Sequence, residues 1–155
     1  IRPLLRVRTA QVSKPVRFNR RQLSVFQGDS YMRNRSEVLA AYHAYLDAFV
    51  ASDEDAIHAK FVWPCAFIMD KETVMFDKFP FSPLEMKARK NWATSTSFEI
   101  DVIAVSDSKA HLVLRNCDRL RPDGSLIENA TAFYAFTKTS DGWKIFAMSA
   151  IEFPA

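Results

Sequence analysis

Four strand-like segments follow one another between residues 97 and 153, and only short turns separate them. They cover residues 97–105, 110–120, 125–138 and 143–153, with turn sequences at Pro122-Asp123-Gly124 and Ser140-Asp141-Gly142. Strands joined by such short turns pair antiparallel, so this half of the chain predicts an antiparallel meander. In residues 97–105, apolar Phe98, Ile100, Val102 and Ala104 alternate with Glu99, Asp101 and Ile103, as expected of a strand with one covered face.

The residues ahead of this meander predict helices. Asn34 followed by Glu37 has the pattern of a capping box, after which Val38, Tyr42, Tyr45, Leu46 and Phe49 recur at helical spacing. Ser52 or Asp53 is expected to cap a second helix. A third helix is predicted over 82–94, where Ser82 is the cap, Pro83 takes the first helical position and Glu85 completes the box.

Two shorter strands, 62–69 and 73–79, are predicted between the second and third helices. Pro64 lacks a backbone N–H, so the first of them is expected to be an edge or irregular strand. The predicted fold class is therefore α+β, with a long curved antiparallel sheet and three helices on one face.

The basic residues are concentrated at the start of the chain. Residues 1–31 hold seven basic residues and one acid, whereas the remaining 124 hold 14 basic and 17 acidic residues. We therefore expect a basic arm at 1–31 and a globular domain at 32–155. The arm would contact an anionic partner, a protein, RNA or a lipid surface, through Arg2, Arg6, Arg8, Lys14, Arg17, Arg20 and Arg21. Its composition also suits a mitochondrial targeting segment, so the predicted location is intracellular, either the mitochondrial matrix or the cytoplasm.

Several classes of protein are excluded or disfavoured by composition. Three glycines are too few for a glycine-rich nucleotide loop, and no stretch approaches the ~20 apolar residues of a membrane span. Neither the histidines nor the cysteines have metal-ligand spacing, so no metal and no cofactor are expected. Cys65 and Cys117 stand in apolar contexts and predict two buried thiols, with a disulfide as the alternative.

Two segments of the chain resemble a known superfamily. "AYLDAFVASDEDAIHAKF" (44–61) is similar to the first two helices of the nuclear transport factor 2-like superfamily, and "DGWKIFAMSAIEF" (141–153) is similar to its last strand. This superfamily includes SnoaL-like polyketide cyclases, ketosteroid isomerase and limonene epoxide hydrolase. The resemblance covers roughly residues 34–153 and implies a cone-shaped half-barrel with a pocket between sheet and helices. It also implies a dimer through the open sheet face, for which we expect Phe133, Ala135, Thr137, Phe146, Met148 and Ala150.

The catalytic positions that the resemblance implies are mostly not filled. Tyr45 falls at the helical tyrosine of the isomerase, but the general base position falls on Met69, with Asp70 one residue on, and the second acid falls near Ala132.

An epoxide-hydrolase arrangement would need Asp101, Arg115 and Asp118 to meet, which their alternation disfavours. A cyclase-type histidine is also unexpected, because His43 and His111 are predicted to face solvent.

Two functional hypotheses follow from the sequence. The first is a non-catalytic module that acts as a dimer or as an accessory subunit of a larger assembly, docked by its basic arm. The alternative is a small-molecule-binding enzyme of isomerase, cyclase, dehydratase or hydrolase type, with Tyr45, Asp70 and Asp118 as its catalytic candidates. In either case an apolar ligand would contact Tyr45, Trp63, Met69, Trp92, Asn116, Asp118, Tyr134 and Met148.

Overall fold

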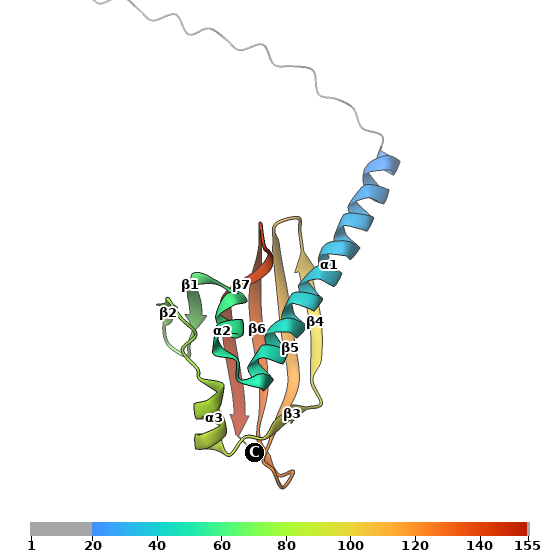
Figure 1. Cartoon of the computed structure of the whole chain (residues 1–155). Coiled ribbons are helices and arrows are strands. Elements are labelled where there is room, and N and C mark those ends of the chain that lie inside the picture. The colour runs from blue at the N-terminus through green and yellow to red at the C-terminus, as the bar shows by residue number, and fades with distance from the viewer. Residues whose placement is uncertain (1–19, 155) are drawn as a thin grey trace, which may run out of the picture.

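The computed structural model describes the backbone of residues 20–154 and the side chains of residues 28–154. Within that range three helices and seven strands follow one another along the chain (Figure 1). The helices are α1 (Arg20–Ala51), α2 (Glu54–Ala59) and α3 (Pro83–Lys90). The strands are β1 (Phe61–Ile68), β2 (Thr73–Phe76), β3 (Thr94–Thr96), β4 (Glu99–Val105), β5 (Lys109–Leu120), β6 (Leu126–Thr139) and β7 (Gly142–Pro154).

All seven strands form one curved, unclosed sheet. The order is β2-β1-β7-β6-β5-β3. Both β3 and β4 pair with the same edge of β5: β4 with its first half and β3 with its last residues. The β4-β5-β6-β7 part is the predicted antiparallel meander. The first strand, β1, pairs in parallel with the last one, β7. The three helices lie on one face of the sheet (Figure 1), so the α+β class and the cone-shaped half-barrel are confirmed.

The caps of the two short helices are confirmed. Asp53 is the N-cap of α2, and its Oδ1 accepts a hydrogen bond from the Ala56 backbone N–H at 2.9 Å. Ser82 caps α3, Pro83 is its first residue, and the Ser82 hydroxyl accepts from the Glu85 N–H at 3.5 Å. These caps satisfy backbone donors that no helical carbonyl can reach, which fixes where each helix begins.

The predicted start of the first helix is wrong. Helix α1 runs without a break from Arg20 to Ala51, so Asn34 lies in its interior and does not cap it. The Asn34 side chain is 2% exposed and bonds instead to the sheet: its Nδ2 donates to Ser106 O and Asp107 Oδ1, both at 3.2 Å, and its Oδ1 accepts from Lys138 Nζ at 3.0 Å. Because the whole side-chain amide of Asn34 has partners outside the helix, it does not hydrogen-bond to backbone N–H groups of α1.

The predicted boundary between arm and domain at residues 31 and 32 therefore falls inside α1. The division into arm and domain stays a prediction. The structure gives no side-chain contacts for residues 1–27, so the seven basic residues assigned to the arm lie outside the described side chains. Among the described helices, none is both long and apolar enough to cross a bilayer.

Irregularities interrupt the regular alternation of the five longest strands. In β1 the pairing with β7 shifts between Phe61 and Ala66, around Pro64, which confirms an irregular strand; β1 is an inner strand rather than an edge. Further shifts lie in β4 after Val102, in β5 between Leu114 and Cys117, in β6 opposite Arg119 and Leu120, and in β7 opposite Ala135 and Phe136. Each extra residue reverses which face the following side chains occupy.

The core between helices and sheet is strongly aromatic. Tyr42 and Tyr45 of α1 pack against Tyr134 of β6, with ring centroids 4.9 Å and 5.9 Å from it. Phe61 and Phe67 of β1 stack at 6.3 Å and meet Phe79 in the loop before α3. Several of these rings, among them Tyr45, Phe79 and Tyr134, also border an open space under the sheet.

Candidate functional site

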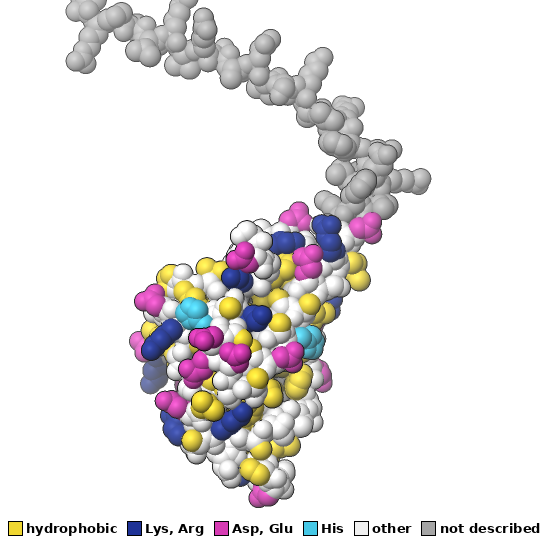
Figure 2. Space-filling view, viewed as in Figure 1, with side chains coloured by type: hydrophobic (Ala, Val, Ile, Leu, Met, Phe, Trp, Pro, Cys, Tyr) yellow, Lys and Arg dark blue, Asp and Glu magenta, His cyan; other side chains and the backbone are white. Residues whose placement is uncertain are grey.

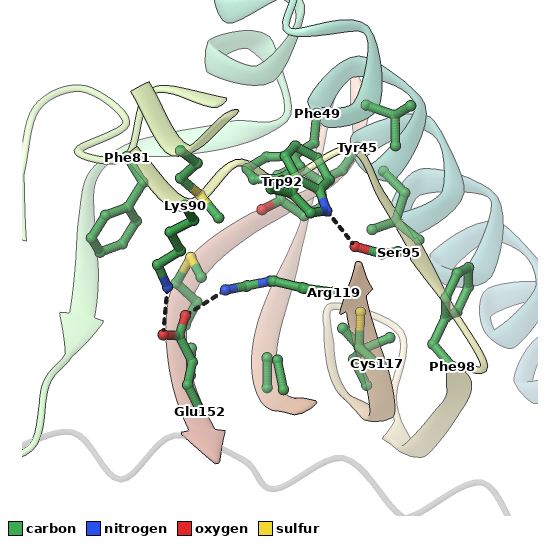
Figure 3. Close-up of a pocket in the computed structure, with 18 of the residues that line it drawn as sticks. Tyr45, Phe49, Phe81, Lys90, Trp92, Ser95, Phe98, Cys117, Arg119 and Glu152 are labelled. Carbon is green, nitrogen blue, oxygen red and sulfur yellow. Dashed lines mark hydrogen bonds and ion pairs between the residues drawn. The ribbon is translucent and has the colours of Figure 1, made fainter. Parts of the chain in front are cut away.

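A cavity of about 310 Å³ lies between the concave face of the sheet and the helices (Figure 3). The walls come from α1, the loop before α3, α3 itself, the segment 92–98 and the inner faces of β5, β6 and β7. The larger apolar side chains in contact with this space are Tyr45, Leu46, Phe49, Phe79, Phe81, Met86, Trp92, Phe98, Leu114, Tyr134 and Met148. Pockets for small molecules are typically ~300–1,000 Å³ and mostly apolar, so this cavity has the size and character for a compact ligand.

Trp92 is held at the mouth of the cavity by the end of α3. Asn91 ends that helix in a left-handed conformation with φ 51°, which turns the chain sharply toward the sheet. The indole Nε1 then donates to Thr94 O at 2.7 Å. It also donates to Ser95 Oγ at 3.1 Å (Figure 3). With its N–H satisfied and 4% of its surface exposed, Trp92 offers the cavity a fixed apolar wall.

The shift in β5 decides which polar residues reach the cavity. Leu114 pairs with Ala132 and Cys117 pairs with Ala130, so two residues of β5 stand opposite one residue of β6. Asn116, in this bulge, has φ 55° and an exposed side chain whose amide donates to Glu99 at 3.3 Å.

The expected alternation, which placed Asn116 and Asp118 on the face of Leu112 and Leu114, is therefore wrong. Beyond the bulge, Cys117 and Arg119 face the cavity instead. Asp118 faces the opposite way and accepts a hydrogen bond from Asn129 Nδ2 at 2.7 Å.

Arg119 belongs to a cluster of four charged residues at the cavity rim. Its Nη1 lies 2.6 Å from Glu128 Oε1 and 2.6 Å from Glu152 Oε1. Lys90 of α3 reaches the same two carboxylates, at 2.7 Å from Glu128 Oε1 and 2.9 Å from Glu128 Oε2. Its contact to Glu152 Oε2, at 3.0 Å, is drawn in Figure 3. The cluster ties α3 to the ends of β5, β6 and β7 and so holds the rim in place.

The electrostatics of this cluster keep Glu152 ionised. Burial pushes the pKa of Glu152 upward, but hydrogen bonds from Lys90 and Arg119 and their positive charges outweigh burial, so the pKa lies below its usual value of 4.5. A carboxylate with a lowered pKa is a weak base at neutral pH. Glu152 is therefore suited to positioning the two cations rather than to taking a proton from a substrate.

The buried tyrosines stay protonated. Burial raises the pKa of Tyr45 well above its usual value of 10.0, and the neighbouring Tyr134 raises it further. Burial likewise raises the pKa of Tyr134, and it raises the pKa of the Cys117 thiol. Tyr45, Tyr134 and Cys117 thus present neutral phenol and thiol groups to the cavity at physiological pH.

The structure brings together half of the residues predicted to contact a ligand. Tyr45, Trp92, Tyr134 and Met148 line the cavity. Met69 and the catalytic candidate Asp70 are exposed and border a second, more open depression of about 640 Å³, which shares Phe81, Met148, Ala150 and Glu152 with the first. Trp63 lies outside both, stacked on His58 at 4.8 Å, and Asn116 and Asp118 also lie outside both.

The structure also tests the expected catalytic arrangements. Ala132, at the second acid position of the isomerase, is part of the cavity wall. Asp101 and Arg115 form an ion pair at 3.5 Å with both side chains more than two-fifths exposed, away from the cavity. An arginine between two carboxylates does occur, but it is Arg119 between Glu128 and Glu152, which sequence alternation did not find.

Of the three histidines, His43 is exposed and His111 packs its ring 5.2 Å from Phe133 on the outer face. His58 stacks on Trp63, so none of the three reaches the cavity. Within residues 28–154 no three side chains of His, Cys, Asp and Glu gather closely enough to hold a metal ion.

The expected composition of the outer sheet face needs one correction. Met148 and Ala150, assigned to a dimer stripe, line the cavity instead. The shift in β7 opposite Ala135 and Phe136 exchanges the faces on which the following side chains lie. Ile151 and Phe153 therefore point outward. Both are 55% exposed.

No family model and no curated protein matches the chain in sequence. Solved structures do match in three dimensions. A candidate dehydratase from the NTF2-like family of Streptomyces avermitilis superposes with a TM-score of 0.57 at 17% identity, over 76% of this chain and 95% of that one. A ketosteroid isomerase-like protein from Erwinia carotovora atroseptica gives 0.54 at 16%, over 77% and 96%.

An NTF2-like protein of unknown function from Shewanella baltica gives a TM-score of 0.54 at 12% identity, over 81% of this chain and 98% of that one. These likenesses show that the chain has the nuclear transport factor 2-like fold. At such low identity they carry no activity over to this chain, because this fold supports many functions.

Proposed function

We propose that this protein is a small-molecule-binding module whose cavity holds a compact, mostly apolar ligand of one or two rings. The observation that carries the proposal is the hollow cone: about 310 Å³ of space with aromatic, methionine and alanine walls and charged groups at the rim. A preformed, concave and mostly apolar space of this size is typical of a small-molecule site.

The charged and polar groups favour binding over acid–base catalysis. Glu152 has a lowered pKa and two cationic partners, and the phenols of Tyr45 and Tyr134 have raised pKa values. General acid–base catalysis works best with a group that titrates near the working pH, and these three do not. The cavity would therefore orient a ligand through shape and hydrogen bonds.

The test is to fill the cavity from the sheet side. Ala132 is 5% exposed and faces the cavity, so Ala132→Phe places a phenyl ring inside it. The matched control is Thr131→Phe, one residue earlier in β6 and on the opposite face, where it pairs with Ile151. We expect 2-naphthamide, measured by isothermal titration calorimetry, to bind the wild type and the control but not Ala132→Phe.

Overpacking costs about 1–3 kcal/mol of stability. Circular dichroism is therefore needed to establish that both variants are folded. Equal binding to Ala132→Phe and to the wild type would overturn the assignment of the cavity as the site. If the wild type binds neither 2-naphthamide nor the carboxylate of the same shape, the proposed binding function is overturned.

A second candidate function, as a dimer or an accessory subunit, is favoured by the outer face of the sheet. Met75 of β2, Ile68 of β1, and Ile151 and Phe153 of β7 lie on that face and are 55%, 41%, 55% and 55% exposed. Large apolar side chains gathered on neighbouring strands are typical of an interface. We propose that a second copy of the chain covers this face.

Sedimentation velocity would decide between the oligomeric states. We expect a dimer for the wild type and a monomer for the Ile151→Asp, Phe153→Asp double variant, because each introduced charge would have to be buried unpaired. A wild-type monomer would refute the dimer. A basic arm at 1–31 that docks on an anionic partner stays a proposal; the native size of the protein in extract from its source would show whether it is part of a larger assembly.

A further inference from the structure

Arg119 is the least exposed of the three basic side chains that line the cavity, among the residues whose side chains are described. Its side chain is 16% exposed, compared with 34% for Lys90, and the third basic residue of the lining, Arg89, is exposed. The bulge at Asn116 turns Arg119 inward, and Figure 3 shows it reaching across the cavity toward Glu152. Removing a charged guanidinium from water costs free energy, so its presence beside apolar walls is unusual.

The ion cluster does not use all of the hydrogen-bond donors of Arg119. Both of its hydrogen bonds, to Glu128 and to Glu152, come from Nη1. Within residues 28–154, Nε and Nη2 have no hydrogen-bond acceptor. Lys90 differs, because its three short contacts to the same carboxylates match its three N–H donors. Donors on the Nε and Nη2 side of Arg119 are therefore available to a ligand.

The balance of charge around the cavity favours an anion. The lining and the ion cluster together hold three basic residues, Arg89, Lys90 and Arg119, and two carboxylates, Glu128 and Glu152. The cluster itself is neutral, so the excess is one positive charge, which attracts a ligand anion and repels a ligand cation. Planar carboxylates also match the fork of an arginine, which can donate two parallel hydrogen bonds to them.

We propose that the ligand of this cavity is an aromatic carboxylate, with its ring between Trp92, Tyr134 and Met148 and its carboxylate on Nε and Nη2 of Arg119. This rests on the proposed function, because it names the ligand class of the same cavity. The aromatic walls select the ring, and the guanidinium selects the carboxylate. The neutral phenols of Tyr45 and Tyr134 add donors that an oxygen of the ligand can use.

The test compares two probes that have the same shape and differ in charge. Calorimetry with 2-naphthoate and with neutral 2-naphthamide on the full chain is expected to give at least about tenfold tighter binding of the carboxylate, since a charge-assisted hydrogen bond is roughly twice as strong as a neutral one. If both probes bind equally, the carboxylate proposal is overturned while the binding function stands. If neither probe binds, the binding function itself fails.

Variants at the rim identify the group responsible. The Arg119→Met, Glu152→Gln double variant removes one charge of each sign, so Lys90 and Glu128 remain paired at 2.7 Å. We expect it to bind both probes with the affinity that the wild type has for the amide. The control is Lys109→Gln, which removes an exposed cation of the same strand outside the cavity lining and is expected to keep the preference for the carboxylate.

Two outcomes would contradict the role of Arg119. One is a preference for the carboxylate that persists in the double variant, since another cation would then be responsible. The other is equal loss of both probes in a double variant whose circular dichroism and thermal unfolding are unchanged, because Arg119 would then only shape the cavity. Arg119→Lys separates charge from geometry: it keeps the cation without the planar fork, and we expect an intermediate preference.

Discussion

Replacement of Asn34 by alanine should loosen the attachment of α1 to the sheet. The Asn34 side chain is 2% exposed and makes three hydrogen bonds to segments more than 70 residues away, namely Ser106, Asp107 and Lys138. A neutral hydrogen bond contributes about 0.5–1.5 kcal/mol net and one to a charged group about 1.5–3. The better helix propensity of alanine returns at most ~0.7 kcal/mol, and the two Nδ2 bonds are long, so we expect a net loss of about 2–3 kcal/mol.

The free energy of unfolding would be measured by urea titration followed by circular dichroism. Ser36→Ala, an exposed change in the same helix, is the control and should stay within about 0.5 kcal/mol of the wild type. A double-mutant cycle with Lys138→Met should give a coupling of about 1 kcal/mol, because Lys138 Nζ loses its 3.0 Å contact to Asn34 in either single variant. A loss below about 0.5 kcal/mol for Asn34→Ala would refute the reasoning, since the three contacts would then not hold the helix to the sheet.

Three further outcomes are expected. Because the pKa of Glu152 is lowered in the folded state, its ion pairs stabilise the fold above its usual pKa of 4.5, and this contribution is lost as the pH falls through the lowered value. The unfolding free energy of Glu152→Gln should therefore fall less steeply with decreasing pH than that of the wild type. Equal slopes would contradict the pairing. Burial raises the pKa of the Cys65 thiol to about 12, so Cys65 should react with a disulfide reagent at pH 8 only after unfolding; rapid labelling of Cys65 in the native protein would contradict its burial. Asn116 holds φ 55° in the bulge, so Asn116→Gly should be near neutral and Asn116→Val should cost about 1–2 kcal/mol in thermal unfolding; equal stability of the two would show that the bulge relaxes.

The architecture could be predicted from the sequence to a large extent. The strands of the meander, the caps at Asp53 and Ser82, and the irregular strand at Pro64 all depend on neighbouring residues, which a sequence displays directly. The first helix was predicted to start too late because Asn34 and Glu37 match a local capping pattern, whereas their true partners come from elsewhere. Glu37 Oε2 accepts from Lys138 Nζ at 2.9 Å and from Trp143 Nε1 at 3.1 Å, on the β6–β7 hairpin.

The apolar part of the site was also within reach of the sequence. Tyr45 and Tyr134 fall on regular stretches of helix and strand, so their direction follows from spacing. The direction of Trp92 depends instead on the left-handed end of α3 at Asn91, and that of Met148 on the shift in β7. The polar part could not be predicted in this way, because the extra residue in β5 at Asn116 turns Arg119 toward the cavity in place of Asp118. One local signal existed: asparagine tolerates positive φ better than most residues, so an asparagine inside a strand can mark a bulge.

Sequence by itself determined the class of fold, the order of its elements apart from the short strand β3, and the apolar character of the space under the sheet, because these depend on periodicity and on residues close together in the chain. Tertiary structure alone decided that Arg119 enters that space and that Lys90, Glu128 and Glu152 surround it. Those four residues come from one helix and three strands. A single extra residue in β5 reverses the face of all that follow, and whether it is accommodated as a bulge depends on the pairing of β5 with β6.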